Sequence, residues 1–269
     1  MSQVRSTAAI ILAAGSSSRM GGGRHKLLLP LEDRPVLAHV IDATLTSQAR
    51  PILVVLGHQA DQVRAHIAAY ATHPDITLIE NPDYLQGMST SMRVGLEVLI
   101  SHGYKKVPSD SLASLPHPRD AINRVPTNSS AEADSLAQSP RPGDAINRVP
   151  TKLSSDVDSA LIILGDQPLV TPRIIDTLIS TWQMTGKRIV APLYDRKRGN
   201  PILFAASLFP ELLEVTGDEG GRSIVERHRQ ELETVELGDA MASYDVDTWE
   251  AYQQVVEAWQ RKKAQESQS

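Results

Sequence analysis

One glycine- and serine-rich segment near the N-terminus carries the residue types that bind phosphate. It runs from Leu12 through Ala13, Ala14, Gly15 and Ser16 to Arg19 and ends at Lys26. Glycines and serines directly after an apolar run expose successive backbone N–H groups, which together form a concavity suited to an anion. Arg19 and Lys26 would add positive charge. The segment has neither the Gly-Lys-Ser/Thr ending of a P-loop nor a Gly-x-Gly-x-x-Gly fingerprint, and a flexible turn with solvated basic residues is the alternative.

A carboxylate follows a second apolar run. Asp166, in Gly165-Asp-Gln-Pro168, comes directly after residues 160–164. At the carboxyl edge of a central strand, such an aspartate can hold a Mg²⁺ ion that bridges phosphate oxygens. The alternative is a turn aspartate that bonds its own backbone.

Asp245 and Asp247 offer a second carboxylate for the same ion. On an extended strand, alternate residues point the same way, so the two side chains would share a face. The sequence does not decide which of them would complete the metal site. Asp247 and Glu250 also have capping-box spacing ahead of an apolar helix at 249–259, so helix capping is an equally good use for Asp247.

Two further segments have the composition of ligand-binding turns. In the segment 86–92, Gly87 and Ser89 precede an amphipathic helix, and this turn can read a base edge or place hydroxyls near phosphate. An ordinary serine N-cap is the alternative.

In the segment 217–222, Arg222 stands ahead of a helix at 223–228. Together with Asn200, which lies upstream, it can bind an acceptor phosphate. A plain loop is the alternative.

The elements that position these residues alternate along the chain. Short apolar runs occur at 8–13, 52–56, 76–79, 160–164 and 189–191, and helical spacing occurs at 36–45, 63–70 and 174–182. This alternation predicts an α/β fold, a single Rossmann-like three-layer domain with a mostly parallel sheet. Ligands of such sheets bind beyond the carboxyl ends of the strands, where the segments above begin.

One segment interrupts the pattern. Residues 105–158 contain seven prolines, nine serines and no aromatic residue, and residues 110–127 match 134–151 at 14 of 18 positions. Such a composition buries too little apolar surface to offset the entropy of ordering. We expect one nucleotide-binding domain over 1–260, interrupted by a duplicated, disordered insertion at 105–158, and a polar tail at 261–269.

Composition excludes several classes. The formal net charge of −5 gives no basic field for a nucleic acid, and the lack of cysteine excludes disulfides and thiolate chemistry. No stretch approaches the ~20 apolar residues that cross a bilayer. We therefore expect a cytoplasmic protein with no nucleic-acid or membrane partner.

Taken in order, these segments resemble the MobA-like nucleotidyltransferases. The shared motifs are Leu-Ala-Ala-Gly-x-Ser-x-Arg-Met-Gly at 12–21 with Lys-x-Leu-x-Pro at 26–30, Gln-Gly-Met-Ser at 86–89, Gly-Asp-Gln-Pro at 165–168, Gly-Asn-Pro at 199–201, Gly-Asp-x-Gly-x-Arg at 217–222 and Asp-x-Asp-Thr at 245–248. The chain looks most like the molybdenum cofactor cytidylyltransferase branch, in which Ala-Ala-Gly at 13–15 is typical of members that use CTP. An extra Gly-Gly-Arg-His before Lys26 departs from the usual spacing.

The resemblance implies a Mg²⁺-dependent transfer of CMP from CTP to the phosphate of molybdopterin, with release of pyrophosphate and with a molybdoenzyme or chaperone as partner. Transfer to a sugar phosphate or another small phosphorylated acceptor, and a non-catalytic nucleotide-binding module, are the alternatives. The implied roles are catalysis by Arg19, Lys26 and Asp166; nucleotide binding by Leu12, Ala13, Ala14, Gly15, Ser16, Arg19, Lys26, Gly87, Ser89 and Asp166; metal binding by Asp166 and Asp247; and acceptor binding by Asn200 and Arg222.

Overall fold

The computed structural model describes residues 5–20, 25–101, 157–238 and 240–266. The expected insertion therefore lies outside the described residues, apart from its last two positions.

The strands are β1 (Thr7–Ala13), β2 (Pro30–Leu31), β3 (Arg34–Pro35), β4 (Ile52–Leu56), β5 (Ile76–Glu80), β6 (Ser159–Leu164), β7 (Ile189–Tyr194), β8 (Lys197–Arg198), β9 (Ile202–Ala205) and β10 (Leu232–Glu236). The helices are α1 (Val36–Thr46), α2 (Ala60–His66), α3 (Ala68–Ala71), α4 (Met88–Ser101), α6 (Pro172–Thr185), α7 (Phe209–Leu213), α8 (Arg222–Arg227) and α9 (Trp249–Glu266).

A mostly parallel sheet organises these elements in the order β10-β7-β9-β6-β1-β4-β5, with β8 paired to β7. β1 lies at its centre and pairs in parallel with β4 on one side and β6 on the other. Its residues are continuously apolar because both faces are covered, as in other sheets with crossover helices.

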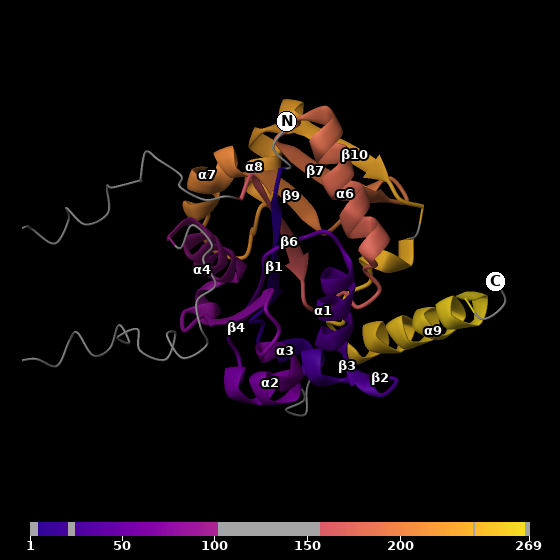
Figure 1. Cartoon of the computed structure of the whole chain (residues 1–269). Helices are drawn as coiled ribbons and strands as arrows, with labels where there is room; N and C mark the ends of the chain where they lie inside the picture. The colour runs from indigo at the N-terminus through magenta and orange to yellow at the C-terminus, as the bar shows by residue number, and fades with distance from the viewer. Residues whose placement is uncertain (1–4, 21–24, 102–156, 239, 267–269) are drawn as a thin grey trace, which may run out of the picture. The chain divides into compact units, whose positions relative to one another are not determined.

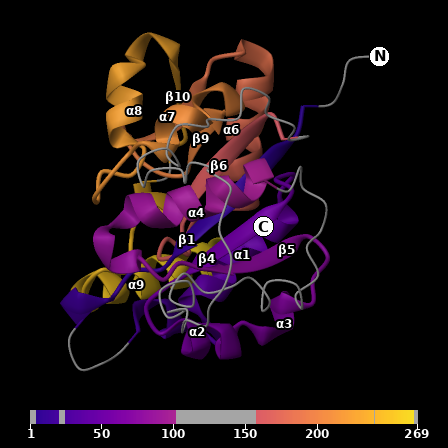
Figure 2. The same cartoon turned by 90° about the vertical axis from the view of Figure 1, so that its left-hand side faces the viewer.

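Alternate residues of β1 supply the two halves of the core. Ala9, Ile11 and Ala13 pack in a cluster with side chains of α1, α2 and α6, whereas Ala8 and Ile10 pack with those of α4, α7 and α8. α1 and α6 therefore cover one face of the sheet, and α4, α7 and α8 cover the other (Figures 1 and 2). The predicted three-layer α/β fold is confirmed.

The structure also departs from the predicted elements. β9 runs antiparallel to both β6 and β7 and separates them, and neither it nor β10 was expected. The predicted helix at 63–70 is two short helices, α2 and α3, because the chain turns at Ile67. α9 continues to Glu266, so residues 261–266, expected in a polar tail, are helical.

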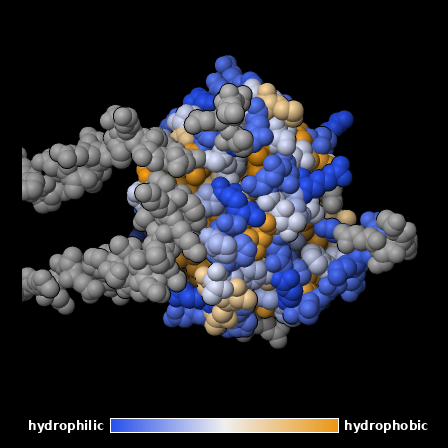
Figure 3. All heavy atoms as spheres, viewed as in Figure 1, coloured by the Kyte–Doolittle hydropathy of each residue, from blue (hydrophilic) through white to orange (hydrophobic). Residues whose placement is uncertain are grey.

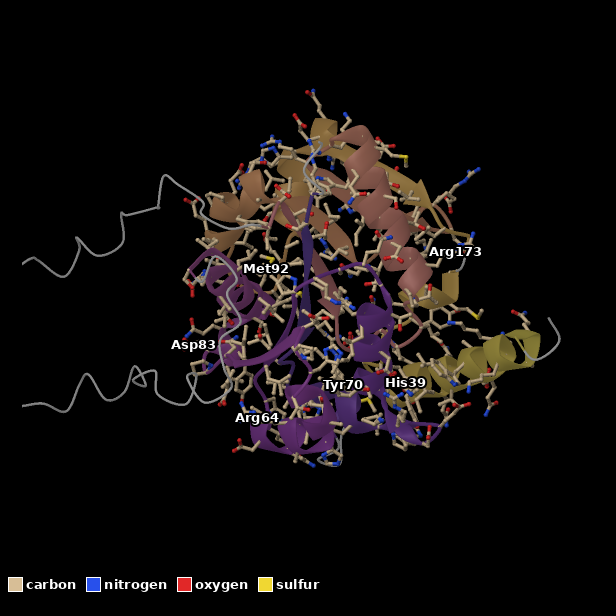
Figure 4. All side chains as sticks on the ribbon, in the orientation of Figure 1. His39, Arg64, Tyr70, Asp83, Met92 and Arg173 are labelled. Carbon is tan, nitrogen blue, oxygen red and sulfur yellow. The ribbon has the colours of Figure 1, made fainter. Side chains whose placement is uncertain are left out.

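α9 is fixed to the domain by a small apolar cluster of its own. Val255 and Ala258 pack against Leu29, Leu31 and Val246. The ring of His39, which Figure 4 labels on α1, meets Trp259 edge-on at 4.4 Å between ring centroids. This cluster holds the chain that enters α9 close to the end of β6.

The visible surface is mixed in character. On the side drawn in Figure 3, hydrophilic side chains predominate and apolar ones are scattered among them. Among the described residues, no helix has the length and hydropathy of a membrane span. The cytoplasmic location stays a prediction.

Candidate active site

The register of β1 and β6 brings the two main sequence motifs to one edge of the sheet. Leu12 is level with Leu164, and the N–H of Gly165 donates to the carbonyl of Leu12 at 2.9 Å. A Cβ on Gly165 would lie 3.0 Å from that carbonyl oxygen, so glycine allows the two chains to leave the sheet in close contact. The turn that follows β1 and the aspartate that follows β6 are therefore neighbours, as predicted.

Lys26 links the carboxylates at this edge. Its Nζ donates to Asp166 Oδ2 and to Asp247 Oδ1, both at 2.5 Å, and Arg19 Nη1 lies 3.1 Å from Asp247 Oδ2. The side chains of Lys26 and Asp166 are only 13% and 14% exposed, whereas Arg19 is 74% exposed. The added residues before Lys26 do not prevent its side chain from reaching the site.

Asp247 reaches Lys26 from a turn, not from the extended strand that the alternation of Asp245 and Asp247 predicted. Its N–H donates to the carbonyl of Asp245 at 3.1 Å, and the N–H of Val246 donates to the carbonyl of Asp166 at 3.0 Å. Thr248 caps α9, since its Oγ1 accepts the N–H of Ala251 at 3.2 Å. Helix capping is thus the wrong role for Asp247, and its carboxylate is available to the site.

The charges of these groups support one another. Burial alone would lower the pKa of Lys26, but the charges of Asp166 and Asp247 and the hydrogen bonds to them raise it above its usual value. Burial likewise opposes ionisation of Asp247, yet Lys26 and Arg19 hold its pKa below the usual value. Burial, followed by the charges of Asp166 and Asp247, raises the pKa of Asp245. Lys26 is therefore a protonated cation between two carboxylates.

The turn after β1 presents free donors beside this cluster. Gly15 and Ser16 are exposed, and their backbone N–H groups donate to no acceptor within the described ranges. Ser17 adopts a left-handed conformation with φ 53°, and its Oγ accepts the N–H of Lys26 at 3.0 Å. The turn is thereby fixed to Lys26 while the N–H groups of Gly15 and Ser16 stay available to an anion.

These groups surround a pocket of about 460 Å³. The pocket is lined by Leu12, Ala13, Ala14, Gly15, Ser16, Ser17, Arg19, Lys26, Leu27, Tyr84, Leu85, Gly87, Met88, Ser91, Leu164, Asp166, Asp218, Asp245 and Asp247. A smaller groove of about 260 Å³ between α1, α6 and α9 contains none of the charged cluster.

The wall opposite the turn is formed by two loops in direct contact. Asp218 Oδ1 accepts the N–H of Met88 at 3.1 Å, and the carbonyl of Gly217 accepts the N–H of Ser89 at 3.0 Å. Gly87 has φ 111°, and a Cβ there would lie 2.5 Å from the carbonyl carbon of Gly217. The 217–218 loop therefore accepts the first N–H groups of α4, and the serine N-cap that was the alternative for this segment is not observed.

Three of the predicted residues do not line this pocket. Ser89 is fully buried behind its wall, and its Oγ has no hydrogen-bond partner in the described structure. The carbonyl of Asn200 accepts the Tyr194 hydroxyl at 2.9 Å, and Arg222 is exposed at the start of α8. Their assigned roles stay predictions.

Sequence reasoning missed several residues of the pocket wall. Tyr84 and Leu85 lie just before the segment 86–92, whereas Met88 and Asp218 lie within the segments 86–92 and 217–222 but were given no role of their own. Exposed apolar side chains are the signal that marks two of them, since Leu85 is 79% and Met88 38% exposed. In the sequence, however, apolar residues at such positions are indistinguishable from core residues.

The carboxylate pair fits a divalent ion. Because each oxygen lies 2.5 Å from Nζ, the two oxygens are at most 5.0 Å apart, and their mutual repulsion would be about 3 kcal/mol at an effective dielectric constant of 20. Among the described residues, no three His, Asp or Glu side chains form a metal site on their own. One or two carboxylates completed by substrate phosphates are the ligand set that Mg²⁺ usually takes.

Comparison with known proteins identifies the family. The family model of the MobA-like NTP transferase domain matches residues 9–232, and the chain belongs to this family. This is a family of nucleotidyltransferases, as the resemblance implied. Over 90 residues it is 41% identical to the bifunctional protein GlmU of Burkholderia orbicola, a match that covers 34% of this chain and 19% of that relative. The chain thus spans about a fifth of the relative's length.

Solved structures share the fold over almost the whole chain. Rv0371c from Mycobacterium tuberculosis H37Rv matches with a TM-score of 0.64 and 23% identity, covering 95% of this chain and 100% of that one. A manganese complex of the same protein matches with a TM-score of 0.60, 23% identity and coverages of 94% and 98%. CMP:2-keto-3-deoxy-manno-octonic acid synthetase complexed with CTP matches with a TM-score of 0.57, 12% identity and coverages of 96% and 99%.

The contact between Gly87 and Gly217 predicts a substitution that damages the pocket wall specifically. Gly87→Ala should weaken nucleoside triphosphate binding by about tenfold or more, since the wall must shift to admit the Cβ. Gly186 is the matched control, because it also has positive φ (65°) but no atom within 4 Å of the place a Cβ would take. Gly186→Ala should lose ~1–2 kcal/mol of stability, and Gly87→Ala should lose more, because its Cβ would also meet the backbone of Gly217. Equal nucleotide affinity of the two variants by calorimetry would contradict this role of the wall.

Proposed function

We propose that this protein transfers CMP from CTP to the terminal phosphate of molybdopterin and releases pyrophosphate, with Mg²⁺ as the metal. The observation that carries the proposal is the position of Lys26, held at 2.5 Å from both Asp166 and Asp247 directly beside the free N–H groups of the turn after β1. Membership of the MobA-like family supports nucleotidyl transfer. The choice of CTP as the nucleotide and of molybdopterin as the acceptor makes the proposal more specific than family membership.

Several features support CTP as the nucleotide. Leu12, Ala13 and Ala14 form the apolar part of the pocket next to Gly15, and Ala-Ala-Gly at this place resembles the members that use CTP. One solved structure of the same fold is a complex with CTP. In the proposed arrangement the base and ribose lie over residues 12–15, and the triphosphate extends toward Arg19 and Lys26.

The chemistry requires no covalent intermediate, because the acceptor phosphate is already an anion. One of its oxygens attacks the α-phosphorus of CTP, the new P–O bond forms, and the bond to the β-phosphate oxygen breaks. Lys26 and Arg19 neutralise the charge that develops on the phosphates, and the N–H groups of Gly15 and Ser16 orient the triphosphate. Asp166 and Asp247 would hold the Mg²⁺ ion, which supplies Lewis-acid stabilisation of the phosphate oxygens.

The acceptor would enter the same pocket as the nucleotide. Asn200 and Arg222 would bind it from outside the pocket lining, which requires an acceptor longer than the phosphate alone. A molybdoenzyme or its chaperone would then receive the product. Transfer of CMP to a sugar acid or sugar phosphate is the second candidate, because a protein that shares the fold is a CMP:2-keto-3-deoxy-manno-octonic acid synthetase.

A nucleotide and acceptor panel tests the proposal. Thermal unfolding with CTP, GTP, ATP or UTP should show the largest Mg²⁺-dependent stabilisation with CTP, ~2.7 kcal/mol at a hundred times the dissociation constant. Pyrophosphate release from CTP should then require molybdopterin. Release with a sugar phosphate and not with molybdopterin would support the second candidate. Tight binding without release from either would indicate a non-catalytic module.

Asp166→Asn tests the role of the carboxylate at the strand edge. The substitution keeps the volume of the side chain but removes the charge that pairs with Lys26, so pyrophosphate release should fall by a factor of about a hundred or more. Asp61→Asn is the matched control, since the Asp61 side chain is 99% exposed on α2. Circular dichroism should give the same folded signal for both. Wild-type release rates in Asp166→Asn would rule out the assignment.

A further inference from the structure

Lys26 stands where the carboxylate pair converges, and this position is the one that a divalent ion would need. Its Nζ contacts one oxygen of Asp166 and one of Asp247 at 2.5 Å each. Both contacts are charge-assisted, and the Lys26 side chain is only 13% exposed. The ammonium and a metal ion therefore compete for the same carboxylate oxygens.

The excess of negative charge in the pocket affects this competition between the ammonium and a metal ion. Four aspartates line it, namely Asp166, Asp218, Asp245 and Asp247, against the cations Arg19 and Lys26. A free triphosphate would add further negative charge to a pocket that already has an excess of carboxylates. A triphosphate that arrives with its metal ion brings less negative charge, and its phosphate oxygens offer Lys26 a new partner.

We propose that Lys26 is an internal counter-ion that occupies the cation position of the nucleotide-free enzyme and moves to the nucleotide's phosphates when metal and nucleotide bind together. The inference rests on the proposed function for the identity of the metal site. It goes beyond that function in assigning Lys26 two successive partners. It also means that the metal ion binds weakly to the enzyme until a nucleotide is present.

The backbone at Lys26, which begins a short 3-10 helix at Lys26–Leu28, is held in place, so a change of partner requires movement of the side chain alone. The backbone N–H of Lys26 is fixed by Ser17 Oγ at 3.0 Å, and Leu27, the next residue, is buried in the core. Gly15 lies beside the side chain of Lys26, and a Cβ at Gly15 would be 3.9 Å from Lys26 Cε with no closer contact. The ammonium can therefore swing from the carboxylates toward the turn's exposed N–H groups without moving the backbone.

The test measures binding of Mn²⁺ alone, by the loss of the free-ion electron paramagnetic resonance signal, to the full chain without nucleotide. Lys26→Met removes the ammonium and keeps an unbranched side chain as far as Cε, so it should bind Mn²⁺ on the order of tenfold more tightly than wild type. Lys187→Met is the matched control, because Lys187 Nζ is bonded to the carbonyl of Gln230 and does not line the pocket. It should bind Mn²⁺ as wild type does. Adding CTP should tighten Mn²⁺ binding in wild type more than in Lys26→Met.

Two further variants keep the test decisive. Asp166→Asn in the Lys26→Met background should abolish the gain, which locates the bound ion at the carboxylate pair. If Lys26→Met does not fold, Lys26→Gln replaces it, and Mn²⁺ should raise its unfolding temperature more than that of wild type. Equal Mn²⁺ affinity of wild type and the Lys26 variant would overturn the proposal. Failure of the proposed function would appear instead as a lack of pyrophosphate release, which leaves these nucleotide-free measurements intact.

Discussion

The contact of one ammonium with two carboxylates is the interaction on which the site depends. Asp166 and Asp247 lie 140 and 221 residues from Lys26 along the chain, yet the three side chains meet within hydrogen-bond distance. Two carboxylates this close repel each other unless a cation lies between them. Every element around the site can be understood as a means of bringing these three side chains together and of leaving room beside them for phosphates.

The sheet supplies most of this arrangement. The parallel register of β1 and β6 fixes where both chains leave the sheet, and the absence of a side chain at Gly165 keeps them in contact. The hydrogen bond from Val246 N–H to the Asp166 carbonyl then brings the C-terminal segment to the same place. α9 and its apolar cluster hold that segment from behind. The pocket wall formed by the 217–218 loop is held by a separate contact, in which Asp218 accepts the N–H of Met88 at the start of α4.

Much of this was predictable from the sequence, because the signals are local. Continuous apolar runs predict buried parallel strands, and residues after the strands predict the edge at which Gly15 and Asp166 meet. The geometry of Asp247 was not predictable. Its spacing to Glu250 suits a helix cap, but Thr248 is better placed for that role in the folded chain, a difference of one residue that only the backbone decides.

Other features depend on contacts that spacing does not encode. β9 is a short strand whose antiparallel direction follows from the connection back from β7, and nothing in its four residues specifies a direction. The wall of the pocket depends on Gly87 and Gly217, which are far apart in the chain and adjacent in space. Asp218 belongs to a glycine-rich loop that the sequence assigned to the acceptor, whereas its carboxylate accepts a backbone N–H of Met88.

A crystal structure of the protein with CTP and Mn²⁺, in which anomalous scattering locates the metal, would show the partners of Lys26 and of the metal together. We expect an Mn²⁺ peak between Asp166 and Asp247, in contact with the nucleotide's phosphates, and Lys26 Nζ on a phosphate oxygen. A nucleotide bound away from the Gly15 turn, or a metal peak elsewhere with Lys26 still between the two carboxylates, would contradict this expectation.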